Sequence, residues 1–112
     1  MKEFITYLDS RIEEGRAEIA ALTADGRKDD ANFAKVRTNI YDVCRTVSRT
    51  LADRPGAGID AIAAQLERFR TTWGAALEKA KQHGDVSGIA VEETKLAALE
   101  DVIAHFREVT GA

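Results

Sequence analysis

Residues 59–80 read IDAIAAQLERFRTTWGAALEKA, and apolar side chains recur along this stretch in alternating steps of three and four. The recurring positions are Ile59, Ile62, Leu66, Phe69, Trp73, Ala76 and Ala80. Steps of this kind place one apolar stripe along a helix, and they favour left-handed packing of such helices against one another. The stretch therefore predicts an amphipathic helix with one buried face.

Three other segments show the same spacing. Their apolar rows are Ile5, Leu8, Ile12, Gly15, Ile19 and Leu22, then Phe33, Val36, Ile40, Val43 and Val47, then Ile89, Leu96, Leu99, Ile103 and Phe106. We expect helices over 2–25, 29–53, 58–83 and 87–110, with Ile12, Ile40, Leu66 and Leu99 in the core. Because short loops make neighbouring helices antiparallel, the sequence predicts an all-α, up-down-up-down, left-handed four-helix bundle. Residues 1–112 would form one such domain.

The breaks between these rows contain residues that end and start helices. Gly26 and Gly84 can adopt the left-handed conformation that ends a helix, and Pro55 lies in a third break. Aspartate and serine side chains can accept hydrogen bonds from the free N–H groups at a helix start. We expect Asp29 or Asp30 to cap the second helix, and Asp85 or Ser87 to cap the fourth.

Three positions within the rows raise specific expectations. Gly15 interrupts a branched apolar stripe, and glycine costs about 1 kcal/mol relative to alanine inside a helix. We expect Gly15 to leave room for the indole of Trp73, because the first and third helices would run parallel. Glu92 stands where an apolar residue is expected, and we predict a solvent-facing first turn there. Cys44 lies beside the second stripe and is expected to behave as a small hydrophobic side chain.

Composition limits the environments and partners of the chain. With 16 Lys and Arg against 19 Asp and Glu, the formal net charge is −3. Proteins that bind nucleic acids or anionic lipid surfaces usually present a broad positively charged surface. Because the net charge here is negative, we expect neither as a partner. No apolar run approaches the ~20 residues that span a bilayer. The single cysteine fits a reducing compartment, and we expect a cytoplasmic protein.

The sequence lacks the ligand spacing of a carboxylate-bridged metal site. Helical bundles hold such sites with a Glu three residues before a His on each of two helices. Val102 precedes His105 by three residues and Ala80 precedes His83, so neither pair fits. We expect no bound metal or cofactor. Asp101 and His105 lie one turn apart, beside the fourth stripe, and are expected to form a solvated pair.

Basic residues are concentrated in the second helix. Residues 27–54 hold seven basic and four acidic side chains, whereas residues 1–26 hold three and six. Opposite charge therefore favours pairing of the first two helices, although each exposed pair contributes under ~1 kcal/mol. The residues predicted to face away from the second stripe, and so to form a binding surface, are Lys35, Tyr41, Arg45 and Arg49. Arg45 and Arg49 are one turn apart, so both guanidinium groups could converge on one anionic group.

These patterns leave three hypotheses about function. The first is a non-enzymatic protein-interaction or structural module that binds a protein partner through its helical surfaces. The alternative is a small binder of a phosphorylated or carboxylate ligand through the basic face of the second helix. The third is an enzyme whose site assembles only at an oligomer interface. The apolar residues Phe4, Ala63, Leu77, Val102 and Val109 flank the stripes and predict either a thicker core or a homodimer surface, of which we favour the homodimer.

Overall fold

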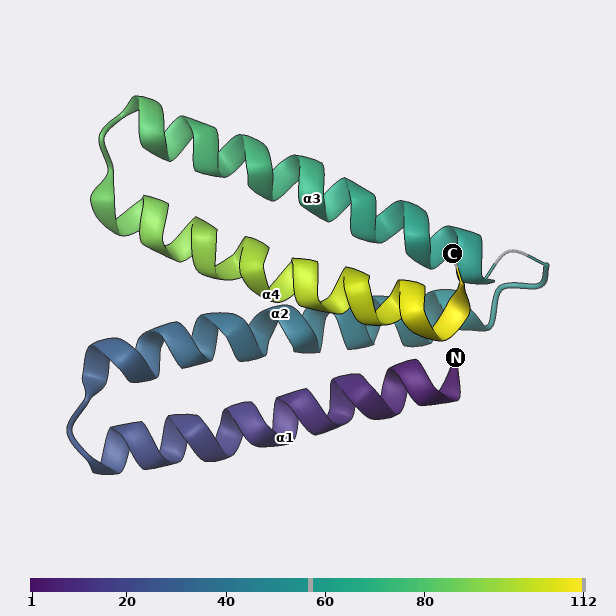
Figure 1. Cartoon of the computed structure of the whole chain (residues 1–112), viewed down its shortest axis with the longest axis horizontal. Helices are drawn as coiled ribbons and strands as arrows, with labels where there is room; N and C mark the ends of the chain where they lie inside the picture. Colours follow the sequence, from purple (N-terminus) through teal and green to yellow (C-terminus); the bar gives the residue numbers. More distant parts are fainter. Residues whose placement is uncertain (57, 112) are drawn as a thin grey trace.

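The computed structural model describes residues 1–56 and 58–111, and four long helices account for most of them (Figure 1). These are α1 (Lys2–Ala24), α2 (Lys28–Ala52), α3 (Gly58–Gln82) and α4 (Val86–Thr110). The described residues contain no strand. Each predicted helix end falls within one residue of the observed end, so the all-α prediction with four helices is confirmed.

The turns between helices follow the predicted chemistry in part. Gly26 and Gly84 have φ of 74° and 63°, the left-handed conformation expected of them. Asp85 caps α4 by accepting a hydrogen bond from the Gly88 N–H at 3.0 Å. The predicted cap of α2 is wrong, because the helix starts one residue early, at Lys28, after Arg27. Asp29 and Asp30 therefore lie inside the first turn, where their charge interacts favourably with the helix dipole.

The core lies near the end of the molecule that holds both chain termini (Figure 1). Buried residues of α1 and α3 belong to their N-terminal halves, and those of α4 belong to its C-terminal half. The largest fully buried side chains of these three helices are Phe4, Leu8, Ile12, Ile62, Leu66, Leu99, Val102 and Phe106. All four predicted core residues are buried. Phe4 and Val102 are fully buried as well, so these two thicken the core rather than form a homodimer surface.

The helices form two hairpins that diverge away from this core. α1 packs on α2 and α3 packs on α4, while α2 also contacts both α3 and α4. The hairpins meet at the end with the termini and separate toward the α1–α2 and α3–α4 turns (Figure 1). No Cα of α1 lies within 8 Å of a Cα of α3 along these fully described helices. The molecule is consequently flat and wide, with extents of 46 × 35 × 20 Å.

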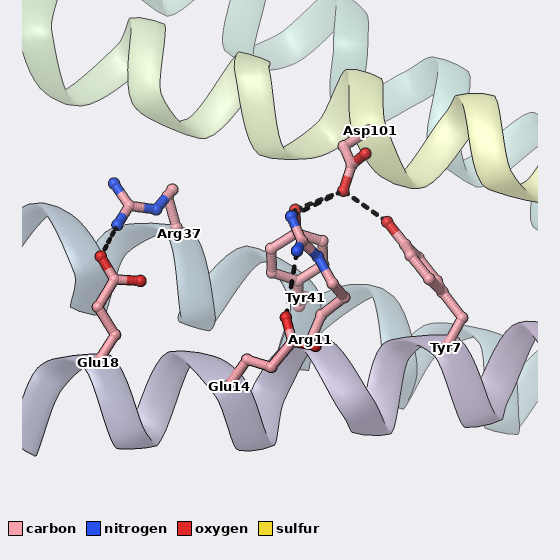
Figure 2. Close-up of polar contacts among 7 residues, drawn as sticks. All are labelled: Tyr7, Arg11, Glu14, Glu18, Arg37, Tyr41 and Asp101. Atoms are coloured by element: carbon pink, nitrogen blue, oxygen red, sulfur yellow. Dashed lines mark hydrogen bonds and ion pairs between the residues drawn. The ribbon is translucent and has the colours of Figure 1, made fainter.

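Ion pairs connect the two helices of each hairpin. Arg37 donates to Glu18 at 2.6 Å, which joins basic α2 to acidic α1 as the charge distribution predicts (Figure 2). In the second hairpin, Arg70 donates to both carboxylate oxygens of Glu100, at 2.7 and 2.9 Å. Opposite charges therefore support the pairing within each hairpin.

Gly15 contacts α2 and does not make room for Trp73, so that expectation is wrong. A Cβ atom added at Gly15 would collide with the hydroxyl oxygen of Thr38 and lie 3.0 Å from its Cβ and Cγ2. Thr38 is fixed because its hydroxyl donates to the Ala34 carbonyl oxygen at 2.7 Å. The physical reason is the divergence of the hairpins, which keeps α1 and α3 apart. Glycine at this position lets α1 and α2 approach closely.

We predict opposite effects of alanine at two helical glycines. Gly15→Ala should destabilise the chain by roughly 1–3 kcal/mol, because the new methyl group collides with Thr38. Gly74→Ala should stabilise it by about 0.5–1 kcal/mol, because a Cβ there meets nothing within 4 Å and alanine favours the helix. Urea denaturation followed by circular dichroism measures both changes in the free energy of unfolding. Equal effects of the two substitutions would contradict the close approach at Gly15.

Candidate interaction surface

The four residues predicted to form a basic binding face on α2 do not share one exposed surface. Tyr41 is only 5% exposed and belongs to the core cluster, so its predicted solvent-facing position is wrong. The reason is that α1 and α4 both pack against this side of α2, which widens its buried face beyond the apolar stripe. Lys35 is exposed in the N-terminal half of α2. The four residues thus occupy distinct environments.

Arg45 and Arg49 do converge on one anionic group, and that group belongs to the same chain. Asp9 of α1 accepts hydrogen bonds from Arg45 at 2.9 Å and from Arg49 at 3.4 Å through the same oxygen. Arg45 also donates to Asp42 at 2.9 Å. The hydrogen bond with Asp9 is the main cause that raises the pKa of Arg45. Both cations are therefore already compensated within the α1–α2 hairpin.

A polar cluster that the sequence did not predict joins α1, α2 and α4 (Figure 2). One carboxylate oxygen of Asp101 accepts hydrogen bonds from the Tyr7 hydroxyl at 2.6 Å, the Tyr41 hydroxyl at 2.7 Å and Arg11 at 3.2 Å. Arg11 also donates to the Tyr41 hydroxyl at 2.9 Å. His105, one turn after Asp101, stacks on the ring of Tyr7 with centroids 3.7 Å apart. We call Tyr7, Arg11, Tyr41 and Asp101 the tyrosine–aspartate cluster.

The electrostatics of this cluster favour one protonation state. Burial and the hydrogen bond to Asp101 raise the pKa values of Tyr7 and Tyr41, so both hydroxyls stay protonated as donors. Burial pushes the pKa of Asp101 upward, but the hydrogen bonds from both tyrosines and the charge of Arg11 together outweigh it. The pKa of Asp101 is therefore lowered, and its carboxylate stays ionised. In this state the cluster holds three helices together. None of the pKa shifts of its two tyrosines and its aspartate moves toward neutral pH, so the cluster offers no group suited to accept a proton there.

An apolar groove lies at the other end of the molecule, between the N-terminal halves of α2 and α4. It encloses about 430 Å³ and its walls are Asp29, Asn32, Phe33 and Val36 on α2, and Val86, Ser87, Ala90 and Val91 on α4. Val86 is 78% exposed, which makes it one of the two exposed large hydrophobic residues among those described. Phe33, Val36, Ala90 and Val91 are half-buried. We call this feature the α2–α4 groove.

Aromatic and charged residues of α3 and α4 contact one another. Phe69 and Trp73 of α3 stack with ring centroids 4.7 Å apart. Lys95 of α4 lies 5.1 Å from the centre of the Trp73 ring and 3.3 Å from a carboxylate oxygen of Glu92. Glu92 is half-buried and paired, so the predicted solvent-facing position is wrong. The ammonium group of Lys95, held over the indole, supplies the partner that a half-buried carboxylate requires.

The remaining titratable groups within 1–56 and 58–111 offer no metal site and no reactive thiol. No group of three or more His, Cys, Asp or Glu side chains within 1–56 and 58–111 is arranged to hold a metal ion. Cys44 is fully buried, and burial raises the pKa of its thiol to about 12. Its expected role as a small hydrophobic core residue is confirmed. No described helix combines the length and apolar character needed to cross a membrane.

Comparison of the chain with known protein families, with curated proteins and with solved structures found no match in any of the three. The properties of the candidate surfaces therefore rest on their own geometry.

The lowered pKa of Asp101 predicts an acid-sensitive contribution to stability. A carboxyl whose pKa is lower in the folded state stabilises the fold above its unfolded pKa of about 3.9, and this contribution is lost as the pH falls below that value. Asp101→Asn should lower the urea midpoint at pH 7 and should reduce the loss of stability on acidification. Glu108→Gln, on an exposed residue of α4 without an ion pair among the described residues, is the matched control. The same pH dependence in Asp101→Asn and wild type would contradict the role of the cluster.

The burial of Cys44 predicts a protected thiol. A thiol with a pKa of about 12 has very little thiolate at neutral pH, and thiolate is the reactive form. An aromatic disulfide reagent should therefore label native protein at least about a hundredfold more slowly than protein unfolded in urea. Thiol release followed by absorbance measures both rates. Equal rates would mean that Cys44 is accessible in the native state.

Proposed function

We propose that this chain is a non-enzymatic protein-interaction module that binds a helical protein segment in the α2–α4 groove. The observation that carries the proposal is the position of Val86, which is 78% exposed at the mouth of a groove with several half-buried apolar side chains. Contiguous exposed apolar surface of this kind marks interaction sites. An amphipathic helix is a suitable ligand, because its apolar face can lie in a groove between two helices.

Two other observations support binding over catalysis. The tyrosine–aspartate cluster has its donors directed at one carboxylate, and its two tyrosine hydroxyls have raised pKa values. An active site instead brings together groups with pKa values suited to proton transfer near neutral pH. The thiol of Cys44 is buried and poorly ionised, which makes it a poor nucleophile. The polar groups with the most perturbed pKa values thus serve the fold.

The contacts of α2 also favour a protein partner over a small anionic ligand. Arg45 and Arg49 already share Asp9, so an external phosphate or carboxylate would have to compete with an intramolecular partner. Tyr41, the proposed aromatic donor, is buried and donates to Asp101. Lys35 remains as an exposed cation in the N-terminal half of α2.

Three finer expectations about the chain remain part of this proposal. The short turns at Asp25–Arg27 and His83–Asp85 support an up-down-up-down order of helices. The steps of three and four in all four segments favour left-handed winding where the helices pack together. A cytoplasmic location is proposed from the single cysteine, whose thiol is free and buried.

Site-specific photo-crosslinking in the cells that naturally make the chain tests the proposed groove. A benzophenone amino acid at Val86 should give a defined covalent adduct with a protein, because the residue lies at the groove mouth. The matched control is the same amino acid at Ile59, the other exposed large hydrophobic residue among those described, at 43% exposure. Ile59 lies in the first turn of α3, at the opposite end of the molecule. An adduct yield at Val86 no higher than at Ile59 would overturn the proposed function.

A further inference from the structure

We infer that the occupant of the α2–α4 groove is a second copy of this chain, bound about a twofold axis so that each copy covers the groove of the other. This inference rests on the proposed function, because it assigns the partner of the same groove. Three properties of the molecule support it: its shape, its exposed area and the distribution of charge along the helix segments beside the groove.

The shape of the chain leaves space for further helices. Four helices packed in a square would measure about 20 Å in both short dimensions, because one helix with its side chains is about 10–12 Å wide. The observed short dimensions are 35 and 20 Å. The radius of gyration of 15.1 Å likewise exceeds the value of about 13 Å for a compact domain of this length. The additional width is comparable to the diameter of one helix and lies where the hairpins diverge (Figure 1).

The exposed area approaches what a dimer interface requires. The chain exposes 6648 Å², whereas a monomeric protein of 12.2 kDa exposes about 6,060 Å². The excess is about 590 Å² per chain, and a stable interface of standard size buries about 800 Å² per partner. A second copy that covered the groove would therefore return the exposed area per chain to the range of compact proteins.

The helix segments on the two sides of the groove have opposite net charge, although Asp29 is the one charged residue among those that line it. The α2 side, residues 27–37, holds four basic and two acidic side chains, and the α4 side, residues 85–95, holds one basic and three acidic. A twofold axis that runs parallel to the groove brings the α2 side of one copy against the α4 side of the other, so segments of opposite net charge meet at both contacts. Lys28, Lys35 and Glu93 form no ion pair with another described residue, so they are available for such contacts. A surface that is complementary to itself favours a second copy over an unrelated helix.

Sedimentation equilibrium of the purified chain at high micromolar concentration tests this inference. We expect a mass of twice 12.2 kDa for the wild type. Val86→Glu should weaken dimerisation at least tenfold, because it places a charge on the most exposed apolar residue of the groove. The variant should still fold, because Val86 is mostly exposed and a glutamate in the first turn of α4 interacts favourably with the helix dipole. Ile59→Glu, the matched control in the first turn of α3, should dimerise like the wild type.

A charge exchange tests the arrangement of the two copies. Lys35→Glu and Glu93→Lys should each weaken dimerisation, and the two substitutions together should restore it, since opposite charges would again meet between copies. A monomeric wild type, or a dimer unaffected by Val86→Glu, would overturn the inference. The photo-crosslinked adduct separates this failure from failure of the proposed function. An adduct of two copies supports both, an adduct with another protein removes only the second copy, and the absence of an adduct removes both.

Discussion

Phe4 of α1 and Phe106 of α4 pack edge to face with ring centroids 5.1 Å apart, and both side chains are almost fully removed from water. Burying an aromatic side chain of this size stabilises a fold by roughly 1.5–3 kcal/mol. The contact joins the first helix to the last beside both chain termini, where the main core lies (Figure 1). Because large buried side chains are concentrated there, this end holds the hairpins together while the opposite end remains open.

The tyrosine–aspartate cluster sets the relative orientation of the helices around this apolar core. The hydrophobic effect does not depend on the relative orientation of the groups that pack, whereas hydrogen bonds require a defined geometry. The hydrogen bonds from Tyr7 and Tyr41 to one oxygen of Asp101 therefore fix the rotation of α1, α2 and α4 relative to one another. Surface ion pairs within each hairpin contribute little individually. Together these contacts join the hairpins at the end with the termini, whereas the α2–α4 groove lies where the hairpins diverge. This arrangement connects the packing of the chain to its proposed role in binding another protein chain.

Several properties of the candidate site could not be predicted from spacing alone. Tyr41 was expected on the exposed face of its helix because it lies off the apolar row, yet two neighbouring helices cover it. Its partner Asp101 is 60 residues away along the chain, and no local pattern connects the two. Arg45 and Arg49 were expected to converge on an anionic group of a partner or ligand, whereas in the folded chain they share Asp9, which comes within reach because α1 packs on α2. Tyr7 and Arg11 are four residues apart and therefore lie on the same face of α1, where both donate to Asp101. This spacing was a local signal in the sequence, and the search for apolar stripes did not consider it.

Local sequence patterns specify the four helices, their ends to within one residue, and the core residues Ile12, Ile40, Leu66 and Leu99. These features depend on local chemistry, namely the 3.6-residue period of a helix and the conformational freedom of glycine at turns. Three features follow only from the packing of the whole chain. The two hairpins diverge, Gly15 contacts Thr38, and a groove with the exposed residue Val86 lies between α2 and α4. An apolar stripe specifies that a helix face is buried, but the identity of the covering helix depends on side-chain volumes and contacts summed over the whole chain. In α4, accordingly, Leu99, Ile103 and Phe106 are buried near the chain termini, whereas Ala90 and Val91 line the groove, and in the stripe of α2 only Ile40 is buried.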